Sequence, residues 1–365
     1  MKKYHVYGIG NALVDMEFEV EPSFLTKMKV EKGLMTLVDQ DRQSELLTNL
    51  EGTSHARSCG GSAANTIIAV SQFGGNAFYS CKVANDETGE FYYKDLVGNG
   101  VTTNMGENRE DGVSGKCMVF ITPDADRTMN SFLGITETFS TNELVESELV
   151  DSEYLYIEGY LVTSPTGKAA AIKARELAHK NDVKVALTFS DPGIVGFFKE
   201  GFKEIIGDKK VDLLFCNEAE AMSFTDSDNI DTAVNLLKSV AKSFAVTLGE
   251  NGAIVYDGER EIAVETKKVE AKDTNGAGDL FAGAFLYGIT NGLGMAGAGD
   301  LASRASSKVV SQYGPRLRRE QTQTILEEFQ GDVICVEISA KQKRYTSKIM
   351  QVLVLNHLIG YFNLR

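Results

Sequence analysis

A glycine-rich turn that runs directly into an apolar helix carries the clearest chemical signal in the chain. The turn reads Asp-Thr-Asn-Gly-Ala-Gly-Asp over residues 273–279, and a segment of small and apolar residues follows it to about Gly288. Such a turn leaves several backbone N–H groups without intrahelical partners at the positive end of the helix dipole. Because glycine has no side chain, an anion can approach these amides closely. We therefore predict that the amides of Gly276, Ala277 and Gly278 bind a phosphate or a developing oxyanion.

Asp279 ends this turn and could have either of two roles. Acidic side chains are common in the first turn of a helix, where they interact favourably with the helix dipole. Alternatively, Asp279 could act as a general base that accepts a proton from an attacking hydroxyl, while the neighbouring amides hold the transferred group. The turn by itself leaves both interpretations open.

The composition limits the partners that such a site could serve. The chain has 365 residues, of which 43% are hydrophobic and 24% charged, and a formal net charge of −14. These fractions are typical of a globular protein, and the negative charge argues against nucleic acid as the main partner. The five cysteines include no CxxC pair, and no apolar stretch reaches membrane-spanning length. We expect a cytoplasmic protein that acts on a small molecule, with no nucleic acid or membrane partner.

Strand and helix patterns alternate after residue 150. This alternation predicts an α/β fold, in which a mostly parallel sheet is covered by helices on both faces. Ligands bind such sheets at the carboxyl ends of the strands. The predicted strands cover residues 154–157, 184–188, 211–216, 244–248 and 253–256. Polar or glycine residues follow three of them, at Asp191, Asn217 and Gly249, so we expect these residues to lie near the turn at 273–279.

Two segments in the N-terminal half also carry groups that could bind a ligand. The first predicted strand is followed by Asn11 and Asp15, whose alternative roles are a turn residue and a surface charge. Further along, Gly60 and Gly61 open a helix rich in small residues, and Asn65 stands one turn into it. Glycine lets backbone approach a ligand, and the Asn side chain offers both a donor and an acceptor. Tight helix–sheet packing would explain the small residues but not Asn65.

Together these segments resemble the ribokinase-like (PfkB) family of carbohydrate and nucleoside kinases, and among its members most of all the bacterial adenosine kinase-like proteins. The turn at 273–279 matches every fixed position of the C-terminal signature, and Gly60-Gly61-x-x-x-Asn65 matches the N-terminal one. The resemblance covers roughly residues 4–320. It implies a ribokinase-like three-layer sandwich with a mostly parallel central sheet and a small β-sheet lid.

The resemblance also assigns roles to individual residues. The last Asp of the C-terminal signature is the general base of the family, and the amides before it form the anion hole; these roles fall on Asp279 and on residues 276–278. Contacts to the substrate hydroxyls fall on Asn11, Asp15, Gly60, Gly61 and Asn65. Arg127 would close over the active site, although an exposed charge in a hairpin is an equal alternative for this residue.

ATP and Mg²⁺ are the cofactors that the resemblance implies, and a monovalent cation such as K⁺ could be a third. Asn217 and Glu220 match the family's Asn-x-x-Glu motif, which organises magnesium. Residues three apart share one face of a helix, and oxygen ligands suit Mg²⁺. A helix N-cap followed by an acidic first turn is the alternative. Nucleotide binding falls on Asn217, Thr247, Gly249, Gly252 and Asp273.

The resemblance further predicts how the chain is divided. A kinase domain would span residues 1–335, with its lid built from about 12–38 and 101–133. Residues 336–365 contain five Lys or Arg against one Glu, a net charge of +4. Family members commonly end before such a segment, and we assign this basic C-terminal extension no role. A monomer and a homodimer remain equally open.

The predicted activity is ATP-dependent phosphorylation of a primary hydroxyl, with an alcohol group as the acceptor. Adenosine, which would yield AMP, is the expected substrate, and Met35, Phe132 and Phe139 could provide the apolar slot for its base. A sugar kinase for ribose, fructose or 2-keto-3-deoxygluconate is the alternative, since it would share the same signatures. A non-catalytic nucleotide or nucleoside sensor is a third interpretation, which the presence of Asp279 disfavours.

Overall fold

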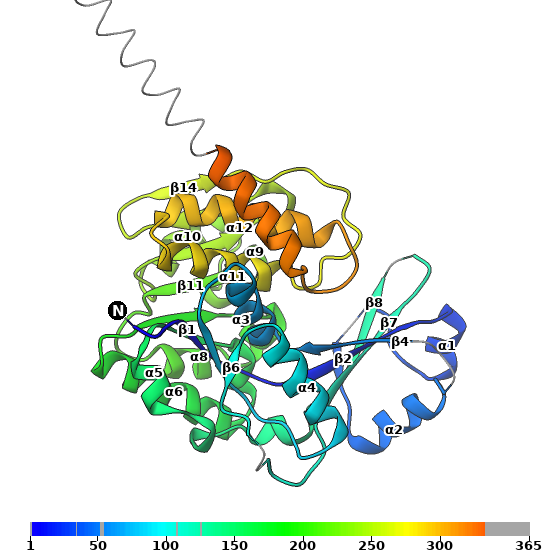
Figure 1. Ribbon diagram of the computed structural model, residues 1–365. Coiled ribbons are helices and arrows are strands. Elements are labelled where there is room, and N and C mark those ends of the chain that lie inside the picture. Colours follow the sequence, from blue (N-terminus) through cyan, green and yellow to red (C-terminus); the bar gives the residue numbers. More distant parts are fainter. Residues whose placement is uncertain (1, 34, 52–54, 107–108, 125, 333–365) are drawn as a thin grey trace, which may run out of the picture.

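A large, twisted β-sheet forms the centre of the molecule (Figure 1). The computed structural model describes residues 2–332 except 34, 52–54, 107–108 and 125. Within these residues the sheet has nine strands in the order β14-β13-β12-β11-β10-β9-β1-β5-β6, parallel from β12 to β6, with β13 and β14 antiparallel at the other edge. The strands are β1 (Tyr4–Ile9), β5 (Ala77–Ser80), β6 (Thr102–Thr103), β9 (Ser152–Ile157), β10 (Lys184–Thr188), β11 (Leu213–Asn217), β12 (Phe244–Thr247), β13 (Ala253–Tyr256) and β14 (Glu261–Val264).

Helices cover both faces of this sheet because successive strand residues point to opposite sides. On β11, for example, Phe215 packs into one hydrophobic core and Leu214 into another. The first core includes α3 (Ser62–Gln72), α11 (Ala277–Thr290) and α12 (Gly294–Val310). The second includes α6 (Pro165–Lys180), α8 (Lys199–Ile206), α9 (Glu218–Thr225) and α10 (Ile230–Leu237). This arrangement of three layers confirms the predicted fold class.

A second, smaller sheet lies to one side of the large one (Figure 1). Its five described strands run in the order β3-β8-β7-β2-β4. They are β2 (Leu13–Glu19), β3 (Met35–Leu37), β4 (His55–Gly60), β7 (Gly115–Ile121) and β8 (Arg127–Phe132). Helices α1 (Pro22–Lys27) and α2 (Gln40–Thr48) lie beside this sheet. The remaining α-helices with defined bounds in the described residues are α4 (Glu87–Gly98), α5 (Glu146–Val150) and α7 (Pro192–Phe197).

The sequence predicted a lid built from about residues 12–38 and 101–133, and two strands depart from that prediction. Strand β4 joins it from outside those segments and pairs with β2. Strand β6 lies inside the segment 101–133 but pairs with β5 in the large sheet. The proposed division at residue 335 stays a prediction, and residues 336–365 lie outside the described part of the chain.

Close packing between α3 and α11 brings the two signature segments together. Gly283 of α11 faces α3, and a Cβ atom added there would lie 2.6 Å from both the Thr66 carbonyl oxygen and the Ala69 Cβ. Only glycine therefore allows the helices to approach this closely. The approach places the first turns of both helices at the same edge of the sheet.

Substituting Gly283 should therefore destabilise the protein by forcing the two helices apart. We expect Gly283→Ala to lower the free energy of unfolding by about 1–3 kcal/mol, as overpacking usually does. Gly98→Ala at the end of α4 is a matched control, because no atom lies within 4 Å of the added Cβ. It should leave the free energy unchanged or raise it by up to about 1 kcal/mol. Urea unfolding of both variants measures the difference, and equal effects would contradict this account of the packing.

Candidate active site

A cavity of about 330 Å³ lies where the carboxyl ends of the large sheet face the small sheet. Asn11, Glu158 and Asn217 line it from the ends of β1, β9 and β11. The first turns of α3 and α11 form a second wall, and residues of the small sheet form a third. The site therefore lies where parallel sheets of this kind bind ligands.

The turn before α11 places Asp279 at this cavity. Gly276 has a left-handed backbone with φ of 74° and is the N-cap of α11. A Cβ atom here would lie 2.1 Å from the Pro315 carbonyl oxygen, so no other residue fits the turn. Two side chains of α3 hold the Asp279 carboxylate: Ser62 Oγ donates to one oxygen at 2.7 Å and Asn65 Nδ2 to the other at 3.0 Å. Two hydrogen bonds therefore link the Asp279 side chain of α11 to α3.

The surroundings of Asp279 suit a group that takes up a proton near neutral pH. Removal from water raises the pKa of its carboxyl to about 6, and the hydrogen bonds from Ser62 and Asn65 limit that rise. A general base works best when its pKa is close to the working pH. Asn65 Oδ1 is buried without a partner among the described residues, so one acceptor beside the carboxylate remains open.

The amides of the turn are open to the cavity. Residues 276–278 all line it. In the part of the chain that the structure describes, the N–H groups of Gly276 and Gly278 have no acceptor, whereas that of Ala277 donates to the Thr274 carbonyl at 3.3 Å. Free donors at the start of a helix of 14 residues are suited to bind an anion. Two of the three amides predicted for the anion hole therefore have no other acceptor.

Asp15 presents an unpaired carboxylate at another wall of the cavity. Its side chain is buried, and no described residue donates a hydrogen bond to it. Burial raises the pKa of this carboxyl to about 7, although the positive charge of Arg316 opposes the rise. Gly60 makes room for it, since a Cβ atom there would lie 2.3 Å from the carboxylate. Gly61 has φ of 97° and packs on the Asn11 backbone. The open oxygens of Asp15 can accept hydrogen bonds from ligand hydroxyls.

Glu158 is a buried carboxylate of the site that the sequence analysis missed. It accepts hydrogen bonds from the Asn11 backbone at 3.2 Å, the Asn11 side chain at 3.0 Å and the Ala63 backbone at 2.8 Å. Burial raises the pKa of its carboxyl to about 7. Its place directly after β9 was a signal in the sequence, since polar residues at strand ends face the ligand edge. Ser62 gave no such signal, because its role depends on contact with a distant helix.

Asn217 and Glu220 form the helix cap that was the alternative to a metal site. Asn217 Oδ1 accepts from the Glu220 amide at 2.8 Å, and the Glu220 carboxylate accepts from the Asn217 backbone and side chain at 3.0 and 2.8 Å. Both line the cavity, and burial together with the charges of Asp191 and Asp279 raises the pKa of Glu220 to about 7. A cation would relieve this repulsion. No three His, Cys, Asp or Glu residues cluster as metal ligands within the described ranges, so a cation here would need water or ligand oxygens as well.

The residues predicted for nucleotide binding at the next strand lie beside Asn217. Thr247 ends β12 and is the register partner of Asn217 on β11. Gly249 and Gly252 follow with φ of 58° and 87°. The space around Gly249 is open, whereas a Cβ atom at Gly252 would lie 2.1 Å from the Val264 carbonyl oxygen. None of the three lines the cavity that contains Asp279.

Arg127 connects the small sheet to the turn. Its guanidinium lies 3.1 Å from Glu17 and 2.5 Å from Asp273, and only 12% of its side chain is exposed. Asp273 also accepts hydrogen bonds from the Asn275 and Gly314 amides at 3.0 and 2.8 Å. The exposed-charge alternative for Arg127 is therefore wrong. The residue does not line the cavity itself and instead contacts the first residue of the turn.

The apolar side of the cavity comes from the small sheet and from Leu133, which directly follows β8. Met35, Leu37, Met129 and Leu133 line it. Of the other residues suggested for an apolar slot, Phe139 is fully buried in the second core, and Phe132 lines a separate groove. Met35 alone of that set faces the cavity, which combines an apolar wall with the carboxylates described above.

Fold and site together define a kinase that acts on hydroxyl groups. The profile of the pfkB family carbohydrate kinases matches residues 33–322, and the chain belongs to this family, as the sequence predicted. Its members are phosphotransferases that use ATP and generally Mg²⁺. No helix in the described ranges is long and apolar enough to cross a membrane.

Individual relatives include both nucleoside and sugar kinases. Adenosine kinase from Saccharomyces cerevisiae is 27% identical over 335 residues, which cover 86% of this chain and 96% of that protein. The structure of a probable sugar kinase from Rhizobium etli is 31% identical in sequence and has a TM-score of 0.83. The match covers 90% of this chain and 99% of that protein. The structure of adenosine kinase from Sinorhizobium meliloti is 34% identical in sequence and has a TM-score of 0.79. The match covers 86% of this chain and 96% of that protein. The chain is thus a nucleoside or sugar kinase.

The buried carboxyl of Glu158 should make stability depend on pH. Its pKa rises from 4.5 to about 7 on folding, so the folded state binds the proton more tightly than the unfolded state. The free energy of unfolding should therefore fall as pH rises from about 4.5 to 7, by up to about 3 kcal/mol from this group, and stay level above 7.

Glu158→Gln should reduce that fall, because the group can no longer titrate. Urea unfolding at several pH values between 5 and 8 measures it, and Glu328→Gln, at an exposed position, is the control. An unchanged pH dependence in Glu158→Gln would show that Glu158 ionises normally.

Proposed function

We propose that this protein transfers the γ-phosphoryl group of ATP to the primary hydroxyl of adenosine and so forms AMP. The observation that carries the proposal is the Asp279 carboxylate, held by two side chains of α3 beside open amides in a cavity with an apolar wall. The carboxylate can take the proton of a hydroxyl, the amides can hold a phosphoryl group, and the apolar wall can contact a base.

Asp279 would act on the attacking hydroxyl. As the hydroxyl oxygen forms its bond to the γ-phosphorus, its proton passes to the Asp279 carboxylate, and the bond from phosphorus to the bridging oxygen of ADP breaks. Ser62 and Asn65 would keep the carboxylate oriented during this step, since each binds one of its oxygens. Orientation of this kind supplies much of the catalysis in phosphoryl transfer.

The amides at residues 276–278 would stabilise the negative charge that spreads over the transferring group. Preorganised donors are effective because they need no reorientation as charge develops. Asn217 and Glu220 would hold Mg²⁺ through water and phosphate oxygens, and the cation would supply further charge neutralisation. Thr247, Gly249 and Gly252 would contact the rest of the nucleotide, and Asp273 would fix the turn that binds its phosphates. A K⁺ requirement remains a prediction.

The other end of the cavity would bind the nucleoside. Asp15 can accept hydrogen bonds from two ribose hydroxyls, and Gly60 and Gly61 leave room for the ring. Asn11 lies beside them, held by Glu158. Arg127 would keep the small sheet against the turn while the substrate is bound. The apolar side chains of Met35, Leu37, Met129 and Leu133 would cover the adenine face, and this wall favours a nucleoside over a free sugar.

A sugar kinase acting on ribose, fructose or 2-keto-3-deoxygluconate is the second candidate. The likeness to the probable sugar kinase from Rhizobium etli supports it, and the base and anion hole would act in the same way. The apolar wall then has no partner, which is why adenosine stands first. A catalytically silent sensor would have no use for a carboxylate with a pKa of about 6.

Consumption of ATP by the purified chain tests this proposal. Adenosine, other nucleosides, ribose, fructose and 2-keto-3-deoxygluconate are each supplied with MgATP, and ADP formation is measured. We expect the highest kcat/KM on adenosine. Asp279→Asn should lower kcat by about 10²–10⁴-fold, the range that a general base contributes. Asp231→Asn, exposed on α10, should leave kcat unchanged.

Each other outcome has a distinct meaning. Turnover on a free sugar alone would keep the mechanism and replace the substrate. Full activity in Asp279→Asn would remove Asp279 as the base. No turnover on any compound would favour the sensor.

A further inference from the structure

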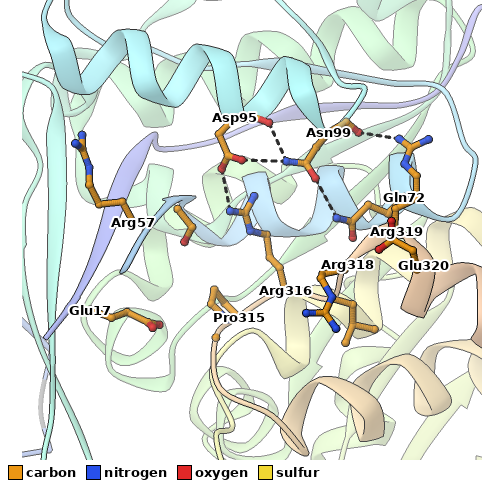
Figure 2. Close-up of a pocket in the computed structure, with 13 residues that line it drawn as sticks. Glu17, Arg57, Gln72, Asp95, Asn99, Pro315, Arg316, Arg318, Arg319 and Glu320 are labelled. Carbon is orange, nitrogen blue, oxygen red and sulfur yellow. Dashed lines mark hydrogen bonds and ion pairs between the residues drawn. The ribbon is translucent and has the colours of Figure 1, made fainter. Parts of the chain in front are cut away.

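Arg316 is a largely buried arginine that lies outside the candidate active site, in a neighbouring cavity of about 430 Å³ (Figure 2). Only 14% of its side chain is exposed. Its Nη2 donates to Asp95 Oδ2 at 2.9 Å, and its Nη1 donates to Cys59 Sγ at 3.5 Å. Burial of a charged group costs free energy. No step of the proposed reaction uses this guanidinium, so its position calls for an explanation.

Contacts on the side chain and on the backbone fix the position of Arg316. The Asp95 oxygen that accepts from Arg316 also accepts from the Cys59 amide at 2.8 Å. Asn99 Nδ2 donates to the other Asp95 oxygen at 3.2 Å (Figure 2). On the backbone, Gln312 Nε2 donates to the Arg316 carbonyl at 3.2 Å. The positive charge is therefore held beside β4, the strand that contains Cys59.

Strand β4 also carries the residues beside Asp15. Ser58 is the register partner of Asp15 on β2, and a Cβ atom added at Gly60 would lie 2.3 Å from the Asp15 carboxylate. These two residues flank Cys59, whose sulfur contacts Arg316. The Asp15 carboxylate therefore lies near Arg316, although only Asp15 lines the active-site cavity.

The charge of Arg316 acts on the Asp15 carboxyl. Removal from water raises the pKa of this carboxyl to about 7, and among the charges around it Arg316 opposes the rise most strongly. Arg127 opposes it as well, but within the described residues Arg127 is paired with two acids and Arg316 with one. The other ionisable groups around the carboxyl are Glu17 of β2, Cys117 of β7 and Asp279 of α11. Since the two acids disfavour a further negative charge, Arg316 is the main group that favours the ionised form of Asp15.

We propose that Arg316 is a positioning residue for substrate binding, which acts through Asp15 by keeping its carboxylate charged and open to the hydroxyls of the substrate. The inference rests on the proposed function, in which Asp15 accepts hydrogen bonds from two hydroxyls. A charged carboxylate offers only acceptors, whereas a protonated one uses one oxygen as a donor. Loss of Arg316 therefore weakens substrate binding, while the transfer step keeps its base and its anion hole.

Carbon-13 NMR titration of the aspartate carboxyl groups in the substrate-free chain measures the charge of Asp15 directly, and Asp15→Asn identifies its signal. We expect Arg316→Gln to move the midpoint of this titration to higher pH by about one unit or more, as loss of a nearby opposite charge does. Arg316→Lys keeps the charge and should stay close to the wild type. Arg318→Gln is the matched control, because it removes an exposed arginine of the same segment that points away from Asp95 (Figure 2). It should leave the midpoint unchanged.

Kinetics with the substrate that has the highest kcat/KM in the ATP-consumption assay test the consequence for binding. At about pH 7.5, Arg316→Gln should raise KM about three- to ten-fold, the difference between a charged and a neutral hydrogen bond, and should change kcat by less than about two-fold. The difference in KM should narrow as pH rises to about 9.5, because Asp15 then ionises in the variant too. Arg316→Lys should restore KM, and Arg318→Gln should match the wild type.

An Asp15 midpoint that is equal in Arg316→Gln and the wild type would overturn the proposal, and so would an increase in KM that persists at high pH. Absence of turnover by the wild type would instead defeat the proposed function, and the NMR titration would then decide the role of Arg316 at Asp15 without any activity. If the unpaired Asp95 keeps Arg316→Gln from folding, the double variant Asp95→Asn/Arg316→Gln removes both charges of the pair. It should also show a higher midpoint, and an unchanged one would contradict the proposal.

Discussion

The Asp279 carboxylate joins two helices that are far apart in the sequence, and the arrangement of the candidate site depends on that contact. Ser62 and Asn65 come from the first turn of α3, and Asp279 comes from the first turn of α11. The helices meet this closely because Gly283 has no side chain. The same approach places the open amides of the α11 turn next to the Asp15 carboxylate and the apolar wall of the small sheet. The proposed base, anion hole and substrate pocket thus share one structural origin.

Burial of several acids in one cavity is costly, and the structure offsets that cost only in part. Asp15, Glu158 and Glu220 all have pKa values raised to about 7 because water is excluded from them. Glu158 and Glu220 are compensated by backbone amides, whereas Asp15 has no donor among the described residues. Acids with perturbed pKa values cluster at functional sites. A sugar hydroxyl and a cation are the partners that would restore the balance in the proposed reaction.

Motifs within one short segment could be read from the sequence, whereas contacts between distant segments could not. The turn at 273–279 and the glycines at 60 and 61 predicted the family and the place of the site, because their chemistry lies in the local backbone. The bond from Ser62 to Asp279 spans 217 positions, and nothing near Ser62 announces it. The pairing of Arg127 with Asp273 likewise depends on geometry that only the folded chain provides. The cap that Asn217 forms on α9 is local, and the sequence had offered it as one of two alternatives.

The pH dependence of kcat/KM in wild type and in Ser62→Ala tests most directly whether Asp279, as held by α3, is the base. Its pKa is raised to about 6, so the rate should fall as pH drops through 6. Ser62 stabilises the charged form, and its removal should move this fall to higher pH while activity persists on the alkaline side. An acid limb that stays in place in Ser62→Ala, or that lies near the ordinary pKa of an aspartate, would contradict the account.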